Sequence, residues 1–192
     1  LAPSHSRMVL AAATDRGVLC ERSRFWSDVY GFRMPSMTQG LSSEAATEDV
    51  EADAIVSDVA TICDLPLEQI PVAQPSFTAP FSLHVKEACK VHGFVSWFDT
   101  WFAPTPHVAF DDLPPVTVSP VQPSDVHGLD LHGNEVVEAS EATHGETVSF
   151  TTSPFGKPTH WKQTIFLLKT PIEVQAGTCL LYTSDAADDM QC

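Results

Sequence analysis

One stretch of the chain combines residue types that could perform chemistry, and it runs from Ser153 to Leu168. It begins with a loop that Gly156 and Pro158 interrupt. It then presents His160 beside Trp161 and ends in an apolar, β-branched run typical of a buried strand. A histidine held where a loop enters a strand can be aimed into a cleft, as a proton-transfer group or as one wall of a pocket for a cation. A simpler interpretation is also open, in which Trp161 belongs to the core and His160 is a hydrogen-bonded loop residue.

The net charge of −15 at pH 7 is concentrated in two segments of the 192-residue chain. Residues 44–58 carry six carboxylates and residues 103–147 carry eight, and neither segment contains a lysine or an arginine. Such a surface is a poor partner for nucleic acid, whereas a basic polypeptide is a reasonable one. Acidic runs can also be plain solvated segments, and for residues 103–147 we favour that interpretation.

The elements that must position the loop are mostly strands. Residues 92–102 carry large apolar side chains at both odd and even positions, which is typical of a strand covered on both faces in a sandwich or a closed barrel. Further strands are expected at residues 7–14, 58–64, 77–85, 148–152 and 164–168. The first of these has nothing before it to pair with, so we expect that part of the protein precedes Leu1.

A short aromatic helix is expected near the start of the chain. Phe25, Trp26 and Tyr30 have helical spacing within residues 21–30, and Gly31 stands where a helix would end. So many aromatic rings on so short a helix must pack on something, which is either the helix's own domain or a partner.

Two segments differ from the rest in composition. Residues 103–147 are rich in proline and predict a long, acidic, mostly disordered insertion between two strands that pair across it. Residues 180–192 break the pattern of the chain, and we expect them to be a non-native tail without structure. The domain is therefore expected to span residues 1–179.

Several common kinds of site are not indicated. The four histidines of residues 103–147 lack the spacing of a structural zinc site, so we expect no metal. There is no glycine-rich phosphate loop, and no apolar run approaches the length needed to span a membrane. The five cysteines show no paired spacing, which suits a reducing compartment, the cytoplasm or the nucleus.

Three separated segments resemble motifs of one family, the type I protein arginine N-methyltransferases. Residues 25–34 (Phe-Trp-Ser-Asp-Val-Tyr-Gly-Phe-Arg-Met) resemble its aromatic segment that ends in Tyr-Gly-Phe. Residues 77–85 (Phe-Thr-Ala-Pro-Phe-Ser-Leu-His-Val) resemble its Phe-Thr-Ser-Pro-Phe strand, and residues 151–164 contain its Thr-His-Trp loop with a Ser-Pro lead-in and a Lys-Gln-Thr exit. The order and intervals of the three agree over about residues 1–178. The long insertion is most similar to fungal members of the branch that carries an N-terminal zinc finger.

The resemblance implies a fold and a division of labour. In this family a domain that binds S-adenosylmethionine is followed by a β-barrel, which closes one wall of the arginine channel, and a helical arm of the barrel grips a second subunit. The chain then corresponds to a mainly β, partial barrel with its arm at about residues 14–40. The methyl-donor domain is missing, so we expect no cofactor to bind this chain and the chain alone to be inactive.

The resemblance also implies roles for particular residues. His160 is expected to support proton removal from the guanidinium or to pair with a carboxylate, while Trp161 and Thr159 line the substrate side. The dimer contact is expected to bury the aromatic side chains of the arm, which are Phe25, Trp26, Tyr30 and Phe32. The expected partners are an Arg/Gly-rich basic protein substrate and a second copy of the chain, with no nucleic acid and no membrane. Two alternatives stay open: a non-catalytic barrel or sandwich module for protein binding or dimerisation, and an unrelated β-sandwich with His160 on an outer surface.

Overall fold

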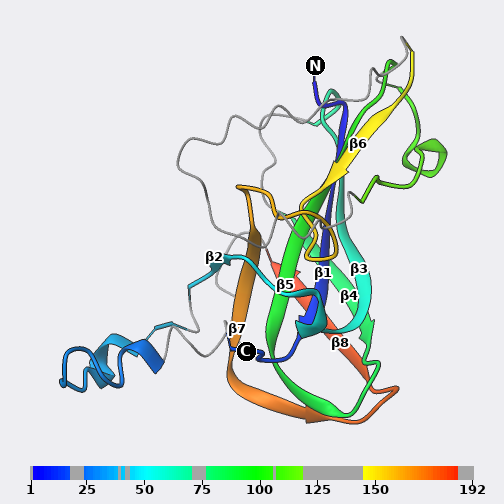
Figure 1. The fold of residues 1–192 in the computed structure, drawn as a ribbon. Coiled ribbons are helices and arrows are strands. Elements are labelled where there is room, and N and C mark those ends of the chain that lie inside the picture. The colour runs from blue at the N-terminus through cyan, green and yellow to red at the C-terminus, as the bar shows by residue number, and fades with distance from the viewer. Residues whose placement is uncertain are drawn as a thin grey trace.

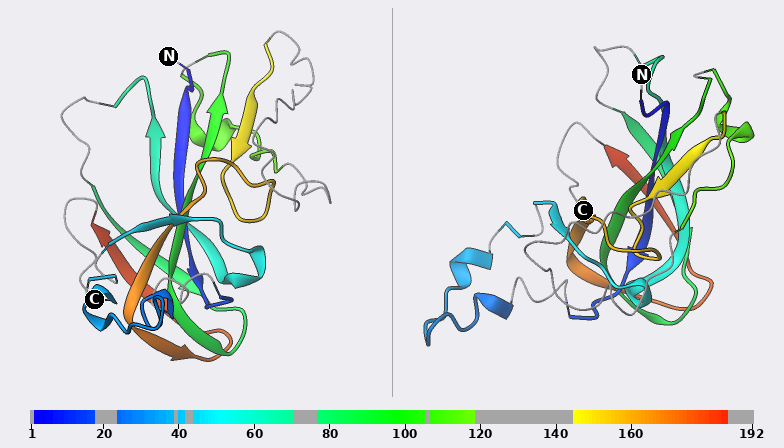
Figure 2. Two further views of the ribbon diagram at one scale, coloured as in Figure 1. Left: turned by 60° about the vertical axis from the view of Figure 1, so that its left-hand side comes forward. Right: turned by 45° about the horizontal axis from the view of Figure 1, so that its top comes forward.

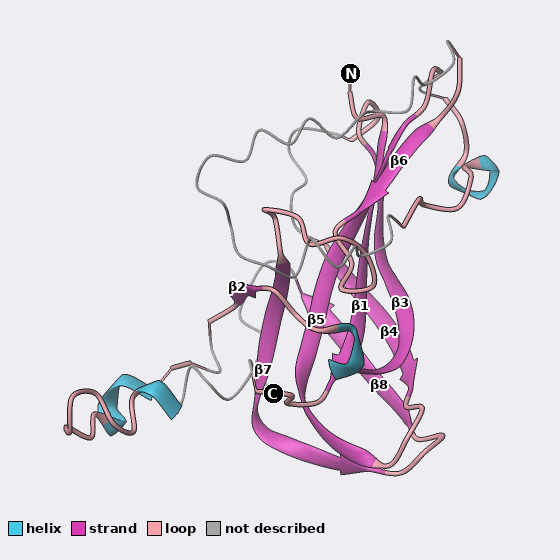
Figure 3. Cartoon of the chain, in the orientation of Figure 1, coloured by secondary structure: helices cyan, strands magenta, loops and turns pink. Residues whose placement is uncertain are grey.

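The computed structural model describes residues 2–17, 24–38, 40–41, 44–70, 77–105, 107–118 and 145–185. Antiparallel strands make up about half of this part of the chain (Figures 1 and 3), and a short arm projects to one side of them. The expected mainly β fold is confirmed.

Six strands form the principal sheet, in the order β2-β7-β5-β1-β3, with β6 paired to β5. Their bounds are β1 His5–Ala13, β2 Ala46–Glu48, β3 Ile55–Pro66, β5 Cys89–Phe102, β6 Val148–Thr151 and β7 Gln163–Val174. A second sheet pairs β4 (Thr78–His84) with β8 (Cys179–Asp185), and an isolated bridge between Ser57 and Val85 joins the two sheets. Within the described residues these strands form a partial barrel rather than one closed sheet.

Apolar side chains cover both faces of the principal sheet. On one face, Val95 and Trp97 of β5 are buried among residues of β1, β2, β3 and β7. On the other face, Phe94 packs against Phe81 and Leu83 of β4, and the Phe81 and Phe94 ring centroids lie 6.0 Å apart. The predicted strand with two apolar faces and the period-two pattern of residues 77–85 are thus confirmed, because the small sheet covers part of one face of the large one.

The first strand has partners on both of its sides. β1 pairs with β3 and with β5, so that His5 lies opposite Pro66 on one side and Trp101 on the other. Both partners come from later in the chain. The lack of an earlier strand therefore leaves no unpaired edge on β1, and this reason for expecting a preceding part does not hold.

The expectation that residues 180–192 lack structure is wrong for residues 180–185. They belong to β8, which pairs with β4 in continuous register from Cys179 opposite His84 to Asp185 opposite Thr78. Tyr182 stacks on Phe81, with ring centroids 6.2 Å apart, and so contributes to the core. Residues 186–192 lie outside the described residues.

The insertion is structured at its beginning. Residues 107–118 come after β5 in the chain and include the 3-10 turn η3 (Phe110–Asp112). The ring of Phe110 contacts His5 and Trp101 in the principal sheet. The prediction of disorder over residues 103–147 is wrong for this part, because the Phe110 ring packs edge-on against His5 and Trp101. The strands on either side do pair across the insertion, as predicted, with Phe102 opposite Val148. Residues 119–144 lie outside the described part.

The arm contains less helix than expected. Of the predicted helix at residues 21–30, residues 21–23 lie outside the described residues, and a tight turn replaces helix at residues 28–32. In this turn the Asp28 carboxylate accepts a hydrogen bond from the Gly31 N–H at 2.8 Å, and Tyr30 and Gly31 both have positive φ. This local bond competes with the helix. A 3-10 turn, η1 (Pro35–Thr38), follows it, and another, η2 (Ala52–Ala54), precedes β3.

Candidate functional site

The segment that carries His160 and Trp161, which we call the His-Trp loop (residues 152–162), joins β6 to β7. Its first residues are fixed to β5. Thr151 donates a hydrogen bond to the Asp99 carboxylate at 2.6 Å and accepts one from the Ser153 N–H at 3.0 Å. The Thr152 N–H donates to the Phe98 carbonyl, and the Thr152 hydroxyl accepts from the Phe98 N–H. The loop therefore starts from a rigid base.

Aromatic rings form a continuous row at the end of the loop. The His160 and Trp161 centroids lie 3.8 Å apart, Trp161 stacks on Phe150 at 5.5 Å, and Phe150 stacks on Phe102 at 6.3 Å. Phe98 meets Trp161 edge-on at 6.0 Å. We call these five residues the aromatic row. Aromatic faces of this kind attract cations.

Trp161 is not part of the core. Its side chain is 48% exposed, and His160 is exposed as well. The simpler interpretation, a buried tryptophan beside a satisfied histidine, is therefore wrong. Exposure alone would also fit an outer-surface histidine, so the catalytic role of His160 stays a prediction.

An apolar cavity of about 320 Å³ adjoins the aromatic row. It is lined by Ser6, Met8, Leu65, Ser96, Trp97, Phe98 and Thr164. Phe98 belongs to both the cavity and the row, so the two form one continuous surface at this end of the sheet.

Two hydroxyl groups in or beside the loop have no hydrogen-bond partner among the described residues. They are the buried oxygens of Ser153 and Thr159. Buried hydroxyls are normally hydrogen-bonded, so such exceptions call for an explanation. Thr159, which the resemblance places on the substrate side, is thus a group with unused bonding capacity, and its contact with substrate stays a prediction.

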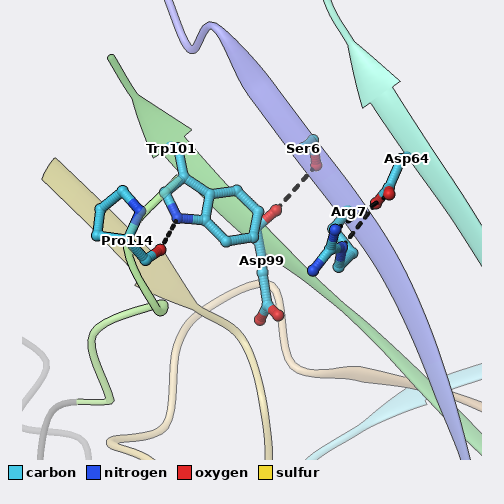
Figure 4. Close-up of polar contacts among 6 residues, drawn as sticks. All are labelled: Ser6, Arg7, Asp64, Asp99, Trp101 and Pro114. Carbon is cyan, nitrogen blue, oxygen red and sulfur yellow. Dashed lines mark hydrogen bonds and ion pairs between the residues drawn. The ribbon is translucent and has the colours of Figure 1, made fainter. Parts of the chain in front are cut away.

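A second cluster, which no sequence motif indicated, lies on the opposite face of β5 (Figure 4). Arg7 forms a bidentate pair with Asp64 at 2.6 and 3.0 Å, and its guanidinium lies 5.2 Å from the Phe110 ring centroid. The hydrogen bond to Asp64 is the main reason that the pKa of Arg7 is raised. The Trp101 indole N–H donates to the Pro114 carbonyl at 2.8 Å. This cluster fastens the start of the insertion to the sheet.

Asp99 lies between that cluster and the loop. Burial raises the pKa of its carboxyl group, while the hydrogen bond from Thr151 and the charge of Arg7 act in the opposite direction. A carboxylate within an apolar strand was the signal in the sequence that could have revealed this position. Its role is to hold Thr151 and thereby the base of the His-Trp loop.

The arm exposes the aromatic side chains that the sequence singled out. Phe25 is 58%, Tyr30 98% and Phe32 72% exposed, whereas Trp26 is half-buried and meets Phe25 edge-on at 5.0 Å. The arm projects away from the sheets in Figure 1 and in the right-hand view of Figure 2. Packing on its own domain, one of the two explanations for these rings, is therefore wrong for the three exposed ones.

The described part of the chain shows no gathering of three or more His, Cys, Asp or Glu side chains suited to a metal ion. His107 is the one histidine of the insertion within that part. Nor do the described residues include a helix long and apolar enough to cross a membrane.

Exposed aromatic side chains that gather on a projecting arm and on a loop at one end of a sheet mark surfaces that contact a partner or a ligand. The family model described as the arginine methyltransferase oligomerization subdomain matches residues 4–128 and 136–189. The chain therefore belongs to the protein arginine methyltransferase family and corresponds to its C-terminal region.

Curated relatives agree with this assignment. The chain is 32% identical over 178 residues to the ribosomal protein arginine N-methyltransferase rmt3 of Schizosaccharomyces pombe, covering 93% of this chain and 27% of that protein. It is 27% identical over 177 residues to protein arginine N-methyltransferase 1 of the same organism, covering 92% of this chain and 41% of that protein. The chain thus spans well under half the length of these two relatives.

Solved structures share the fold. The Trypanosoma brucei PRMT1 enzyme–prozyme heterotetrameric complex with AdoHcy aligns with a TM-score of 0.66 at 24% identity, over 94% of this chain and 45% of that one. The Arabidopsis thaliana protein arginine methyltransferase 10 aligns with a TM-score of 0.56 at 19% identity, over 93% and 48%. At these identities the likeness concerns the fold alone.

Proposed function

We propose that this chain forms the substrate-side wall and the dimer arm of an S-adenosylmethionine-dependent protein arginine N-methyltransferase. The observation that carries the proposal is the exposed His160–Trp161 pair, stacked on Phe150 beside an apolar cavity. Exposed apolar surface of this kind is typical of a site that contacts another protein surface or a ligand. A neighbouring domain and a bound arginine would cover them.

We assign no site for the methyl donor to the described residues. The cavity beside the aromatic row is mainly apolar, and its polar groups are the hydroxyls of Ser6, Ser96 and Thr164. Its lining contains no carboxylate that could bind the ribose hydroxyls of the donor. It also contains no glycine-rich turn that would let the backbone approach the donor closely. The donor site is therefore assigned to residues outside this chain, and the chain contributes on the guanidinium side.

On that side, two residues have suitable chemistry. Trp161, whose side chain is 48% exposed, offers aromatic surface that can hold a guanidinium by cation–π attraction and exclude water from one side of it. His160, in contact with that ring, can accept the proton that the guanidinium nitrogen must lose, or can orient a carboxylate that accepts it. Thr159 adds a hydroxyl with free bonding capacity.

The partners follow from charge and exposure. A chain with a net charge of −15 favours a basic protein substrate, for which an Arg/Gly-rich segment is the expected form. The exposed rings of Phe25, Tyr30 and Phe32 are assigned to the contact with a second copy, in line with the oligomerization subdomain that the chain matches. We place the protein in the cytoplasm or the nucleus, where thiols such as those of Cys63 and Cys89 stay reduced.

The test compares the longer protein encoded with this chain and the 192-residue chain by itself. Each is incubated with S-adenosylmethionine and an Arg/Gly-rich peptide, and methylated arginine is measured by mass spectrometry. We expect transfer by the longer protein and none by the chain alone. Transfer by the chain alone would contradict the assignment of the donor site, and a longer protein that dimerises without any transfer would favour a non-catalytic dimerisation module.

A further inference from the structure

The arm and the His-Trp loop are joined at one point of the sheet. The chain returns from the arm through β2, which pairs with the first residues of β7, with Glu48 opposite Gln163 and Ala46 opposite Ile165. Gln163 is also the first residue of β7, directly after the His-Trp loop. The strand that leads out of the arm therefore lies beside the exit of the loop.

Gln163 bonds to both segments with the two ends of one amide. Its side-chain oxygen accepts a hydrogen bond from the Val50 N–H at 2.8 Å, just beyond β2. Its side-chain NH₂ donates to the Thr152 carbonyl at 2.7 Å, at the start of the loop. The residue is 3% exposed, so these bonds are shielded from water. Leaving either buried backbone partner unsatisfied costs about 1–3 kcal/mol.

A second link runs along the surface. Lys162, the last loop residue, has a φ of 54° and places its ammonium group 3.3 Å from Asp49 and 3.6 Å from Glu48. These pairs are exposed and contribute little to stability. They nevertheless connect the same two segments as Gln163, so the amide is the stronger of two parallel connections.

The His-Trp loop also contains polar groups whose bonding could change if the loop moved. Its two buried hydroxyls, Ser153 and Thr159, lack partners among the described residues. A small shift of the loop could satisfy them, whereas its base at Thr151 and Thr152 is held by Asp99 and Phe98. The end of the loop next to Gln163 is thus the part whose position the arm can influence.

From these contacts we infer that Gln163 is a positioning residue, which couples engagement of the arm by a second copy to the placement of His160 and Trp161. The inference rests on the proposed function for the arm and the loop. Engagement of the arm orders β2, and β2 with Val50 fixes the Gln163 amide. That amide ties the exit of the loop, which carries His160 and Trp161, to the Thr152 carbonyl at its fixed base. Because misplacement of a catalytic group by about 1 Å can reduce a rate about 10²-fold, the coupling is large enough to measure.

The test uses the longer protein and three variants. Gln163→Met removes both bonds at similar volume, and Gln163→Glu keeps the acceptor for Val50 but removes the donor for Thr152. Leu168→Ala is the matched control, because it lies on the same strand but in the core cluster away from the loop. Amide hydrogen exchange of residues 24–38 and 152–162 is followed as protein concentration takes each protein from monomer to dimer, and kcat and KM are measured in the dimer.

In the wild type, dimer formation should slow exchange in both segments. In both Gln163 variants the arm should still become protected, but the loop should not, and kcat should fall about 10²-fold with KM changed less than about threefold. The Leu168→Ala protein should lose stability yet keep the response of the loop.

Loop protection that persists in the Gln163 variants, or disappears equally in Leu168→Ala, would overturn the inference. If the wild-type arm gains no protection, the proposed dimer arm is wrong; if the arm responds but the wild-type loop does not, only the coupling is wrong.

Discussion

Replacing Gly93 by alanine should damage the sheet that carries the His-Trp loop. Gly93 lies in β5 opposite Leu167 of β7, beside an irregularity in the register of the two strands. A Cβ atom at this position would lie 2.4 Å from the Phe166 carbonyl oxygen and 3.2 Å from the Leu167 Cα. The first distance is about 1 Å shorter than ordinary van der Waals contact, and both neighbours are backbone atoms that cannot rotate away.

The cost can be worked out from this geometry. Overpacking of a well-filled site costs about 1–3 kcal/mol, and separating β5 from β7 weakens about one ladder hydrogen bond, which contributes about 1 kcal/mol more. We therefore expect the Gly93→Ala variant to lose about 2–4 kcal/mol of unfolding free energy and roughly 4–16 °C in Tm. The displaced β7 begins at Gln163, so the exit of the loop should shift with it.

Urea unfolding followed by circular dichroism measures the effect in the purified chain. Lys90→Ala is a suitable control, because it removes an exposed ion pair with Glu173 on the same strand pair and should change stability by less than about 0.5 kcal/mol. A Gly93→Ala protein that unfolds within about 0.5 kcal/mol of the wild type would refute the steric argument.

Two further predictions concern the face of β5 opposite the aromatic row. Because burial raises the pKa of Asp99, the folded protein binds more protons than the unfolded chain between the ordinary and the raised pKa, and the wild type loses stability as pH rises through that window. The Asp99→Asn variant cannot ionise there, so its unfolding free energy relative to the wild type should increase with pH from about pH 4 and then level off, and a difference independent of pH would contradict this. Phe110→Ala removes the ring contacts with His5 and Trp101 and the cation–π contact with Arg7, at a cost of about 1–3 kcal/mol. Limited proteolysis should then cut residues 107–118 faster than in a Phe110→Leu control, and equal cutting rates would show that the ring does not fasten the insertion.

The pattern of apolar and turn-forming residues within single segments was enough to predict two strands and one loop. The apolar side chains of β5 on both faces and the period-two spacing of β4 were sufficient to place both strands. The Thr-His-Trp segment was likewise recognisable as a loop that enters a strand, because its Gly and Pro interrupt any regular structure.

Long-range contacts decided the rest. β8 pairs with β4, about one hundred residues earlier in the chain, and nothing in residues 180–185 alone indicates that pairing. Phe110 is one aromatic residue in a proline-rich segment, and only its contacts with Arg7 and Trp101 make it an anchor. The Gln163 amide followed neither from spacing nor from composition, since its two partners are 11 and 113 residues away along the chain.

The arm shows a different limit. Aromatic residues at helical spacing predicted a helix, but the Asp28 side chain bonds to the Gly31 N–H and ends any helix there. The exposure of Tyr30 and Phe32 follows from the turn, not from a helical face. The sequence thus singled out rings that are exposed, but for the wrong structural reason, and their contact with a second copy stays a prediction.

The most direct test of the account is the rate of arginine methylation by the longer protein with a His160→Gln substitution. His84→Gln is the matched control, because His84 is also exposed but lies on β4 and pairs with Asp58. We expect His160→Gln to lower kcat by about 10²–10⁴-fold without changing the affinity for S-adenosylmethionine, and His84→Gln to leave kcat within about twofold of the wild type. A His160→Gln enzyme as active as the wild type, or one no slower than His84→Gln, would contradict the assignment of the His160–Trp161 pair to the active-site wall.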